Sequence, residues 1–207
     1  MSASAPSRPL QNRVAPTGEI VAAAARGTMM GNRGGRIHDP ADKRLVRRRW
    51  ASRAWICCVL SFKNRWREVM GPGYTHLFFL DEATACAAGH RPCYECRRAD
   101  ALAFADAWAE GHSLPRPPRA GEMDAVLHPQ RLGPPDRIAA ADLRPGMFFG
   151  DGDRIFLRRD DDVLPWDWTG YGAPVRPPSG EVSALTPAGM RRVLQAGWRP
   201  GLHPSAT

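Results

Sequence analysis

Short apolar runs separated by turn residues dominate the first half of the chain. Residues 19–25, 54–62 and 74–80 each have strand length and carry β-branched or aromatic side chains, which predicts three strands. A polar break around Asn64 favours a hairpin between the second run and residues 66–70. Residues 26–36 are rich in glycine and arginine, and we expect a loop there whose backbone could approach a phosphate or serve as a plain turn.

Two helices follow from the pattern after these strands. Residues 82–88 are rich in alanine, begin after Asp81, which is a suitable N-cap, and stop at Gly89. Residues 97–110 place Leu102, Phe104 and Trp108 at helical spacing, so we expect an amphipathic helix there.

The second half predicts a smaller β-rich unit. Residues 112–146 are proline-rich and lack a sustained period, so we expect a connecting segment on the surface. Gly-Asp-Gly-Asp at 150–153 predicts a hairpin between residues 147–149 and 154–157. Residues 181–185 suit a strand, and a final helix is expected with Thr186 as N-cap, Pro187 at its first position and an end at Gly197.

These elements indicate an α+β protein with four parts. Residues 1–18 are expected to form a disordered tail, and residues 19–112 the first folded domain. Residues 113–145 are the proline-rich connection, and residues 146–207 form the small β-hairpin-plus-helix module.

Composition limits the class of protein. The 207-residue chain has no apolar stretch of membrane-spanning length and no apolar core of a secretory signal near its start, so we expect a cytoplasmic protein with no membrane partner. Five cysteines, an odd number, argue against a disulfide framework.

The net charge of +8 is unevenly distributed. Residues 1–100 hold 17 basic and 8 acidic side chains, whereas residues 101–207 hold 12 and 13. A dense basic segment suits phosphate contact, so DNA is the expected partner, although a solvated surface is the alternative. The expected nucleic-acid-binding residues are Arg33, Arg36, Arg47, Arg48, Arg49, Arg97 and Arg98.

The strongest chemical signal is the Cys93-x-x-Cys96 knuckle, because two thiolates at this spacing can chelate one metal ion. Further ligands are needed, and the nearest candidates are the adjacent Cys57 and Cys58. Neighbouring side chains on a strand point to opposite faces, so at most one of the two would face the knuckle. His90 is a further candidate ligand, ahead of His38 and His76, while Cys86 reads as a core thiol.

Residues 78–96, FFLDEATACAAGHRPCYEC, resemble the N-terminal metal-binding domain of the Ada DNA-repair family, in which Ala-Ala-Gly-Phe-Arg-Pro-Cys-x-x-Cys follows a strand and an alanine-rich helix. The resemblance implies that residues 19–112 form an Ada-like metal- and nucleic-acid-binding domain. It also implies a zinc ion held by four cysteines, with Cys93 and Cys96 as the second pair. Cys57 or Cys58 takes the first position, which in that family accepts a methyl group from a DNA phosphotriester. The family's remaining cysteine falls at Ser61 or Phe62. The whole layout also resembles a bacterial protein family, which implies no activity.

Three functions are compatible with these features. The first is a zinc-dependent DNA-binding protein, placed in DNA repair or the damage response by the resemblance. The second is a sacrificial methyl acceptor that uses Cys57 or Cys58. The third is a metal-dependent hydrolase or nuclease that uses His38 and Asp39, or His90, near the metal.

Overall fold

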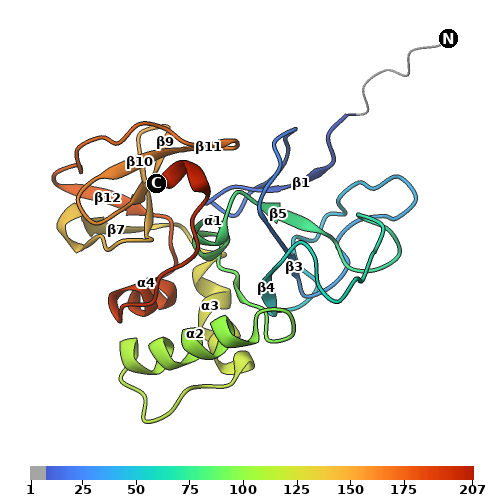
Figure 1. The fold of residues 1–207 in the computed structure, drawn as a ribbon, viewed down its shortest axis with the longest axis horizontal. Coiled ribbons are helices and arrows are strands. Elements are labelled where there is room, and N and C mark those ends of the chain that lie inside the picture. Colours follow the sequence, from blue (N-terminus) through green and yellow to red (C-terminus); the bar gives the residue numbers. More distant parts are fainter. Residues whose placement is uncertain (1–7) are drawn as a thin grey trace.

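The computed structural model describes residues 8–207 and contains two six-stranded sheets and four α-helices in that range (Figure 1). This confirms the α+β class. The first sheet consists of β1 (Gln11–Val14), β2 (Ile20–Ala22), β3 (Met29–Arg33), β4 (Trp55–Cys58), β5 (Leu77–Phe79) and β6 (Arg91–Pro92). Its order is β2-β1-β5-β3-β4-β6.

The second sheet has the order β11-β10-β9-β8-β12-β7. Its strands are β7 (Asp136–Ala139), β8 (Phe148–Asp151), β9 (Arg154–Arg158), β10 (Val163–Asp167), β11 (Gly170–Tyr171) and β12 (Glu181–Ala184). The turn at 151–154 joins β8 to β9 as an antiparallel hairpin, as the Gly-Asp-Gly-Asp signal predicted.

The start of the chain is more ordered than its composition suggested. Residues 1–7 of the expected tail lie outside the described residues, but β1 lies within it and pairs with both β2 and β5. Val14 is fully buried, because it packs into the apolar cluster beneath the first sheet. The prediction of a tail to residue 18 is therefore wrong for β1.

Two further predictions near the sheet centre need correction. The glycine- and arginine-rich segment contains β3, which pairs with β4 and β5 rather than forming a continuous loop. Gly31 permits this pairing, because a Cβ there would lie 2.2 Å from the Ile56 carbonyl oxygen. The hairpin expected between residues 54–62 and 66–70 does not form, since β4 pairs instead with β3 and β6.

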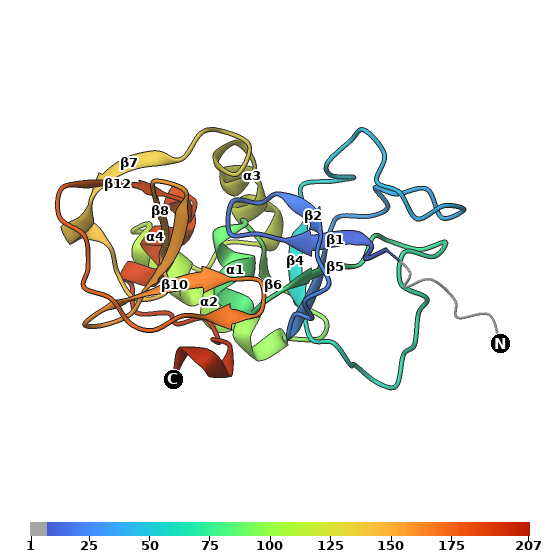
Figure 2. The same cartoon turned by 90° about the horizontal axis from the view of Figure 1, so that it is seen from above.

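Helix α1 (Glu82–Ala87) lies between the two sheets (Figures 1 and 2). Asp81 caps it as predicted by accepting a hydrogen bond from the Thr84 amide at 2.8 Å. Ala85 packs with the cluster of the first sheet, whereas Ala83 and Ala87 pack against side chains of the second. Small side chains on all sides of this helix let both sheets approach it closely.

A helical layer completes the molecule. It consists of α2 (Arg98–Gly111), close to its predicted bounds, α3 (Ala120–Gln130) and α4 (Ala188–Gln195). Residues 113–145 are therefore not an irregular connection, because Met123 and Leu127 of α3 are buried against α2 and α4. Pro187 is the N-cap of α4 in place of Thr186, whose hydroxyl accepts a hydrogen bond from the Phe148 amide.

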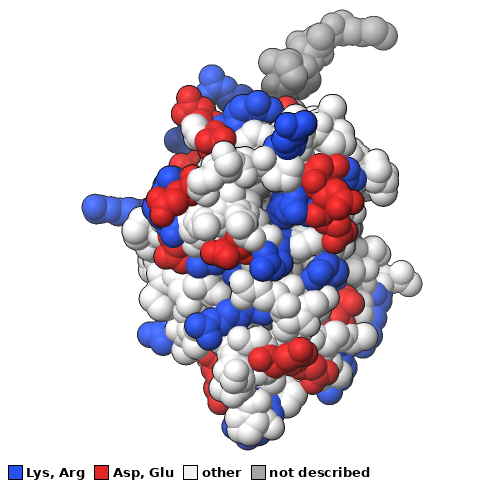
Figure 3. All heavy atoms as spheres, turned by 90° about the vertical axis from the view of Figure 1, so that its left-hand side faces the viewer, with Lys and Arg blue, Asp and Glu red and all other residues white. Residues whose placement is uncertain are grey.

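Charge is mixed on the face that carries the second sheet, where basic and acidic side chains alternate without a dominant sign (Figure 3). By sequence, the positive excess lies in residues 1–100. Within residues 8–207, no helix is both long and apolar enough to cross a bilayer.

Candidate metal centre

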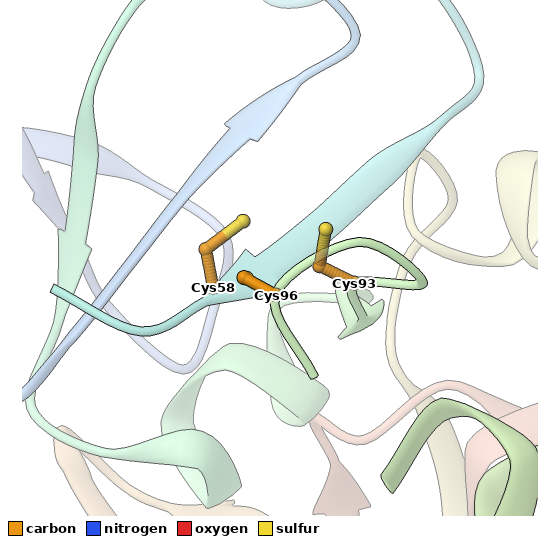
Figure 4. A group of neighbouring side chains, drawn as sticks. All are labelled: Cys58, Cys93 and Cys96. Carbon is orange, nitrogen blue, oxygen red and sulfur yellow. The ribbon is translucent and has the colours of Figure 1, made fainter. Parts of the chain in front are cut away.

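The sulfur atoms of Cys58, Cys93 and Cys96 all lie within 4.8 Å of one another (Figure 4). Cys58 ends β4, and the other two lie on the turn that follows β6. That turn is held beside β4 because the Cys93 amide donates to the Cys57 carbonyl at 2.9 Å. Thiolates around a tetrahedral zinc ion stand about 3.8 Å apart, given zinc–sulfur bonds of about 2.3 Å. The three sulfurs are thus placed to hold a metal ion.

The thiols already interact electrostatically. A hydrogen bond from Cys58, helped by backbone amides that include Glu95, lowers the pKa of Cys93 to about 5. The same hydrogen bond and burial raise the pKa of Cys58, and burial raises that of Cys96. A cation between the sulfurs would replace the remaining thiol protons, because the thiolate is the form that binds metal.

Cys57 lies outside this group. Its side chain points to the opposite face of the sheet, where it is fully buried with Val14 and Leu77. Its sulfur lies 3.8 Å from Nη1 of Arg97, and burial raises the pKa of the thiol. Strand alternation therefore selects Cys58 and excludes Cys57 from the expected ligand set. Cys86 is buried in α1, as its alanine-rich surroundings suggested.

His90 is also outside the group, which corrects its expected role as a ligand. Its ring is fully buried beside Trp55 and Phe79, with ring centroids 5.1 and 4.7 Å apart respectively. Neither ring nitrogen has a hydrogen bond of ordinary geometry, although the backbone of Ala85 and Ala88 favours a proton on the ring. Burial and the nearby arginines Arg33 and Arg131 hold its pKa well below the usual value, so the ring is uncharged.

The two remaining candidate ligands, His38 and His76, make hydrogen bonds outside the three-sulfur group. Both ring nitrogens of His38 are bonded, to the Thr75 hydroxyl at 2.6 Å and the Gly71 carbonyl at 3.0 Å. His76 lines the cleft above the sulfurs, but its ring nitrogens are not part of the three-sulfur group. Its Nδ1 accepts a hydrogen bond from the Met70 amide.

The three sulfurs lie at a cleft of about 410 Å³, which we call the cysteine cleft. Its lining includes aromatic and basic side chains, next to aliphatic ones and the Glu95 carboxylate: Phe62, Arg65, Trp66, Arg67, Tyr74 and Phe78. Trp66 is 85% exposed. None of these lining residues was among the expected site residues, although the interleaved basic and aromatic residues of FKNRWR at 62–67 were a visible signal.

The seven expected phosphate-binding arginines fall into two groups. Arg36, Arg47, Arg48, Arg49 and Arg98 are exposed. Arg33 is only 3% exposed and donates to the Gly18 carbonyl. The Arg97 side chain is 9% exposed and pairs with Glu82 and Asp100. The side chains of Arg33 and Arg97 are thus held within the fold, unlike the five exposed arginines.

Comparison of the chain with protein-family models, with curated proteins and with solved structures found no match. The geometry of the site therefore carries the functional argument, and the likeness to the Ada domain remains an expectation from residues 78–96.

Proposed function

We propose that this protein is a zinc-dependent DNA-binding protein. The observation that supports this best is the convergence of three cysteine sulfurs at a cleft lined by aromatic and arginine side chains. The proposed setting is DNA repair or the damage response, which rests on the resemblance of residues 78–96 to the Ada domain.

Zinc is the proposed metal because the donor set is soft. Thiolate sulfur favours zinc over magnesium or calcium, which take oxygen ligands. Cys58, Cys93 and Cys96 would hold the ion, and a tetrahedral zinc would have one position left for water or a group from the bound strand. When bound, zinc supplies a positive centre that keeps the sulfurs deprotonated at neutral pH.

The DNA contact is proposed for the cysteine cleft and for the exposed arginines of residues 36–49. Guanidinium groups suit phosphate oxygens, and exposed rings such as Trp66 suit stacking on unpaired bases. Binding through phosphates releases counterions, so the affinity should fall steeply with salt and depend little on sequence.

Fluorescence anisotropy with labelled single- and double-stranded oligonucleotides tests this proposal. We expect the slope of log affinity against log salt to decrease in magnitude by about one in Arg47→Ala, because one phosphate contact is lost. Arg176→Ala removes another exposed arginine, from the second half of the chain, and should leave the slope unchanged. Equal effects of both variants, or no binding at low salt, would contradict the proposal.

A sacrificial methyl acceptor is the second candidate, supported by the position of the sulfurs on the cleft wall. In this reaction the Cys58 thiolate would bond to the methyl carbon of a DNA methylphosphotriester. The carbon–oxygen bond breaks, and the phosphate oxygen leaves with the electron pair as an ordinary charged diester. A hydrolase has less support, because His38 and His90 are both committed to other contacts away from the sulfurs.

Mass spectrometry tests the methyl-acceptor candidate. After incubation with DNA that carries methylphosphotriesters, the intact protein should gain the mass of one methyl group, and peptide mapping should place it on Cys58. Cys57→Ala should still gain the methyl group, because that sulfur lies on the other face of the sheet. An unchanged protein mass with fully metal-loaded protein would eliminate this candidate.

A further inference from the structure

Two arginines stack on one buried tryptophan on the far side of the first sheet from the cysteine cleft. The Cζ atoms of Arg33 and Arg131 lie 4.0 and 4.1 Å from the ring centroid of Trp55, which is 2% exposed. Trp55 and Cys58 are three positions apart on β4, so their side chains point to opposite faces. The two sites therefore lie on opposite faces of β4.

The guanidinium groups of this stack form no direct ion pair, although Asp124 lies near enough to Arg131 to favour its charged form. Within residues 8–207, no carboxylate oxygen lies within 4.0 Å of Arg33, Arg49 or Arg131. Burial, together with the charges of Arg131 and Arg49, lowers the pKa of Arg33 to about 9. A cation so placed is stabilised by any anion that reaches it.

Hydrogen bonding is also incomplete. Arg33 donates from Nη2 to the Gly18 carbonyl at 2.6 Å, while its buried Nε has no partner. Arg131 uses both terminal nitrogens on the carbonyls of Gly89 and Arg53, and its Nε is likewise buried without a partner. Most buried donors in proteins are paired. Both Nε atoms are themselves buried from solvent and cannot contact a ligand, but they show that the protein does not saturate these guanidinium groups.

The stack forms part of a recess of about 440 Å³, which we call the arginine recess. Its charged and aromatic lining residues are Glu19, Arg33, Arg49, Trp50, Trp55 and Arg131. A larger cleft of about 680 Å³ shares Thr17, Gly18, Glu19 and Arg131 with it, which leaves room for a ligand larger than a single anionic group.

We infer that the arginine recess binds the phosphate group of a phosphate monoester that carries a planar ring, of which a nucleoside monophosphate is the simplest example. Three guanidinium groups exceed what one carboxylate can balance, whereas a phosphate monoester carries close to two negative charges at neutral pH. The forked donors of arginine match phosphate oxygens, and the half-buried Trp50 offers a ring for stacking. This inference does not rest on the proposed function.

Isothermal titration calorimetry of the full-length protein tests the inference, with adenosine monophosphate and inorganic phosphate as probes at constant ionic strength. Arg49→Ala is the informative variant, because this exposed side chain can be removed without disturbing the fold. It should weaken binding of the monophosphate about tenfold, the expected effect of losing one charge-assisted hydrogen bond. Arg53→Ala is the matched control, since Arg53 is exposed but does not line the recess, and its affinity should equal that of the wild type.

A competition arm identifies the source of the phosphate. Displacement of adenosine monophosphate by an oligonucleotide with a terminal phosphate, but not by the same strand without one, would support a strand end as the ligand. Lack of displacement would support a small free ester. Absence of monophosphate binding, or equal losses in Arg49→Ala and Arg53→Ala, would overturn the inference.

Discussion

Cys57 and Cys58 are adjacent and chemically identical, yet they occupy opposite environments. Cys57 is fully buried in an apolar cluster, and Cys58 faces two other sulfurs. The alternation of side chains along a strand predicts that only one of them can join the knuckle. Which one it is depends on how β4 pairs with β6, and this long-range pairing is not visible in the local sequence.

His90 is the clearest case of a single residue that works against stability. Its ring is buried with two unpaired nitrogens, and its pKa is held well below the ordinary value. The unfolded chain therefore takes up a proton first as the pH falls below about 6.5. Above that pH the ring is uncharged in both the folded and the unfolded state, so its titration does not lower the free energy of unfolding. As the pH falls from there toward the lower folded-state pKa, the free energy of unfolding decreases.

We predict that His90→Phe raises the free energy of unfolding by about 1–3 kcal/mol at neutral pH, because it removes unsatisfied buried polar atoms. The advantage over the wild type should grow below pH 6.5, since the variant has no proton to take up at this position. Urea unfolding at a series of pH values measures both effects. Loss of bound metal, or a difference that stays constant with pH, would contradict the placement of His90.

At the scale of elements, α1 is fixed by its first residues. Asp81 caps the helix, and its other carboxylate oxygen accepts from the Tyr171 hydroxyl at 2.6 Å and the His203 amide at 2.9 Å. The next residue, Glu82, accepts from Arg97 and from the Gly201 amide. Two adjacent carboxylates thus connect the first half of the chain to its last seven residues.

Tyr171→Phe should lower the free energy of unfolding by about 1–2 kcal/mol, because it removes a buried hydrogen bond to a charged acceptor but keeps the ring. Asp81→Asn should be more harmful, since it changes an acceptor shared by the helix cap, the tyrosine and the chain end. Chemical unfolding of both variants measures the difference. A neutral effect of Asp81→Asn would show that these contacts are not stabilising.

Elements with a strong local signal were predictable from the sequence, and those defined by distant partners were not. The Asp81 cap and the hairpin at 150–153 carry their own capping or turn chemistry, and α2 has apolar side chains at helical spacing. In contrast, β1 is a strand only because β5 and β2 flank it. Helix α3 was hidden by its internal Pro129 and by the prolines on both sides.

At the scale of the whole molecule, α1 makes the two sheets depend on each other. Its small side chains pack against clusters of both sheets, so neither cluster is complete without it. We therefore predict a single calorimetric transition for the chain. Chelation of the metal should lower the midpoint of that one transition, because an ion that binds only the folded state stabilises all of it. Two separate transitions, with only the first sensitive to chelator, would contradict this coupling.

Metal content per chain tests the central claim most directly, because the same substitution can be made at two neighbouring positions. Elemental analysis and competition with a chromophoric chelator should find one ion per chain in the wild type and in Cys57→Ala. Cys58→Ala should lose the ion or bind it at least tenfold more weakly, about the smallest effect of losing a direct ligand. Retention of the metal by Cys58→Ala together with its loss from Cys57→Ala would contradict the account.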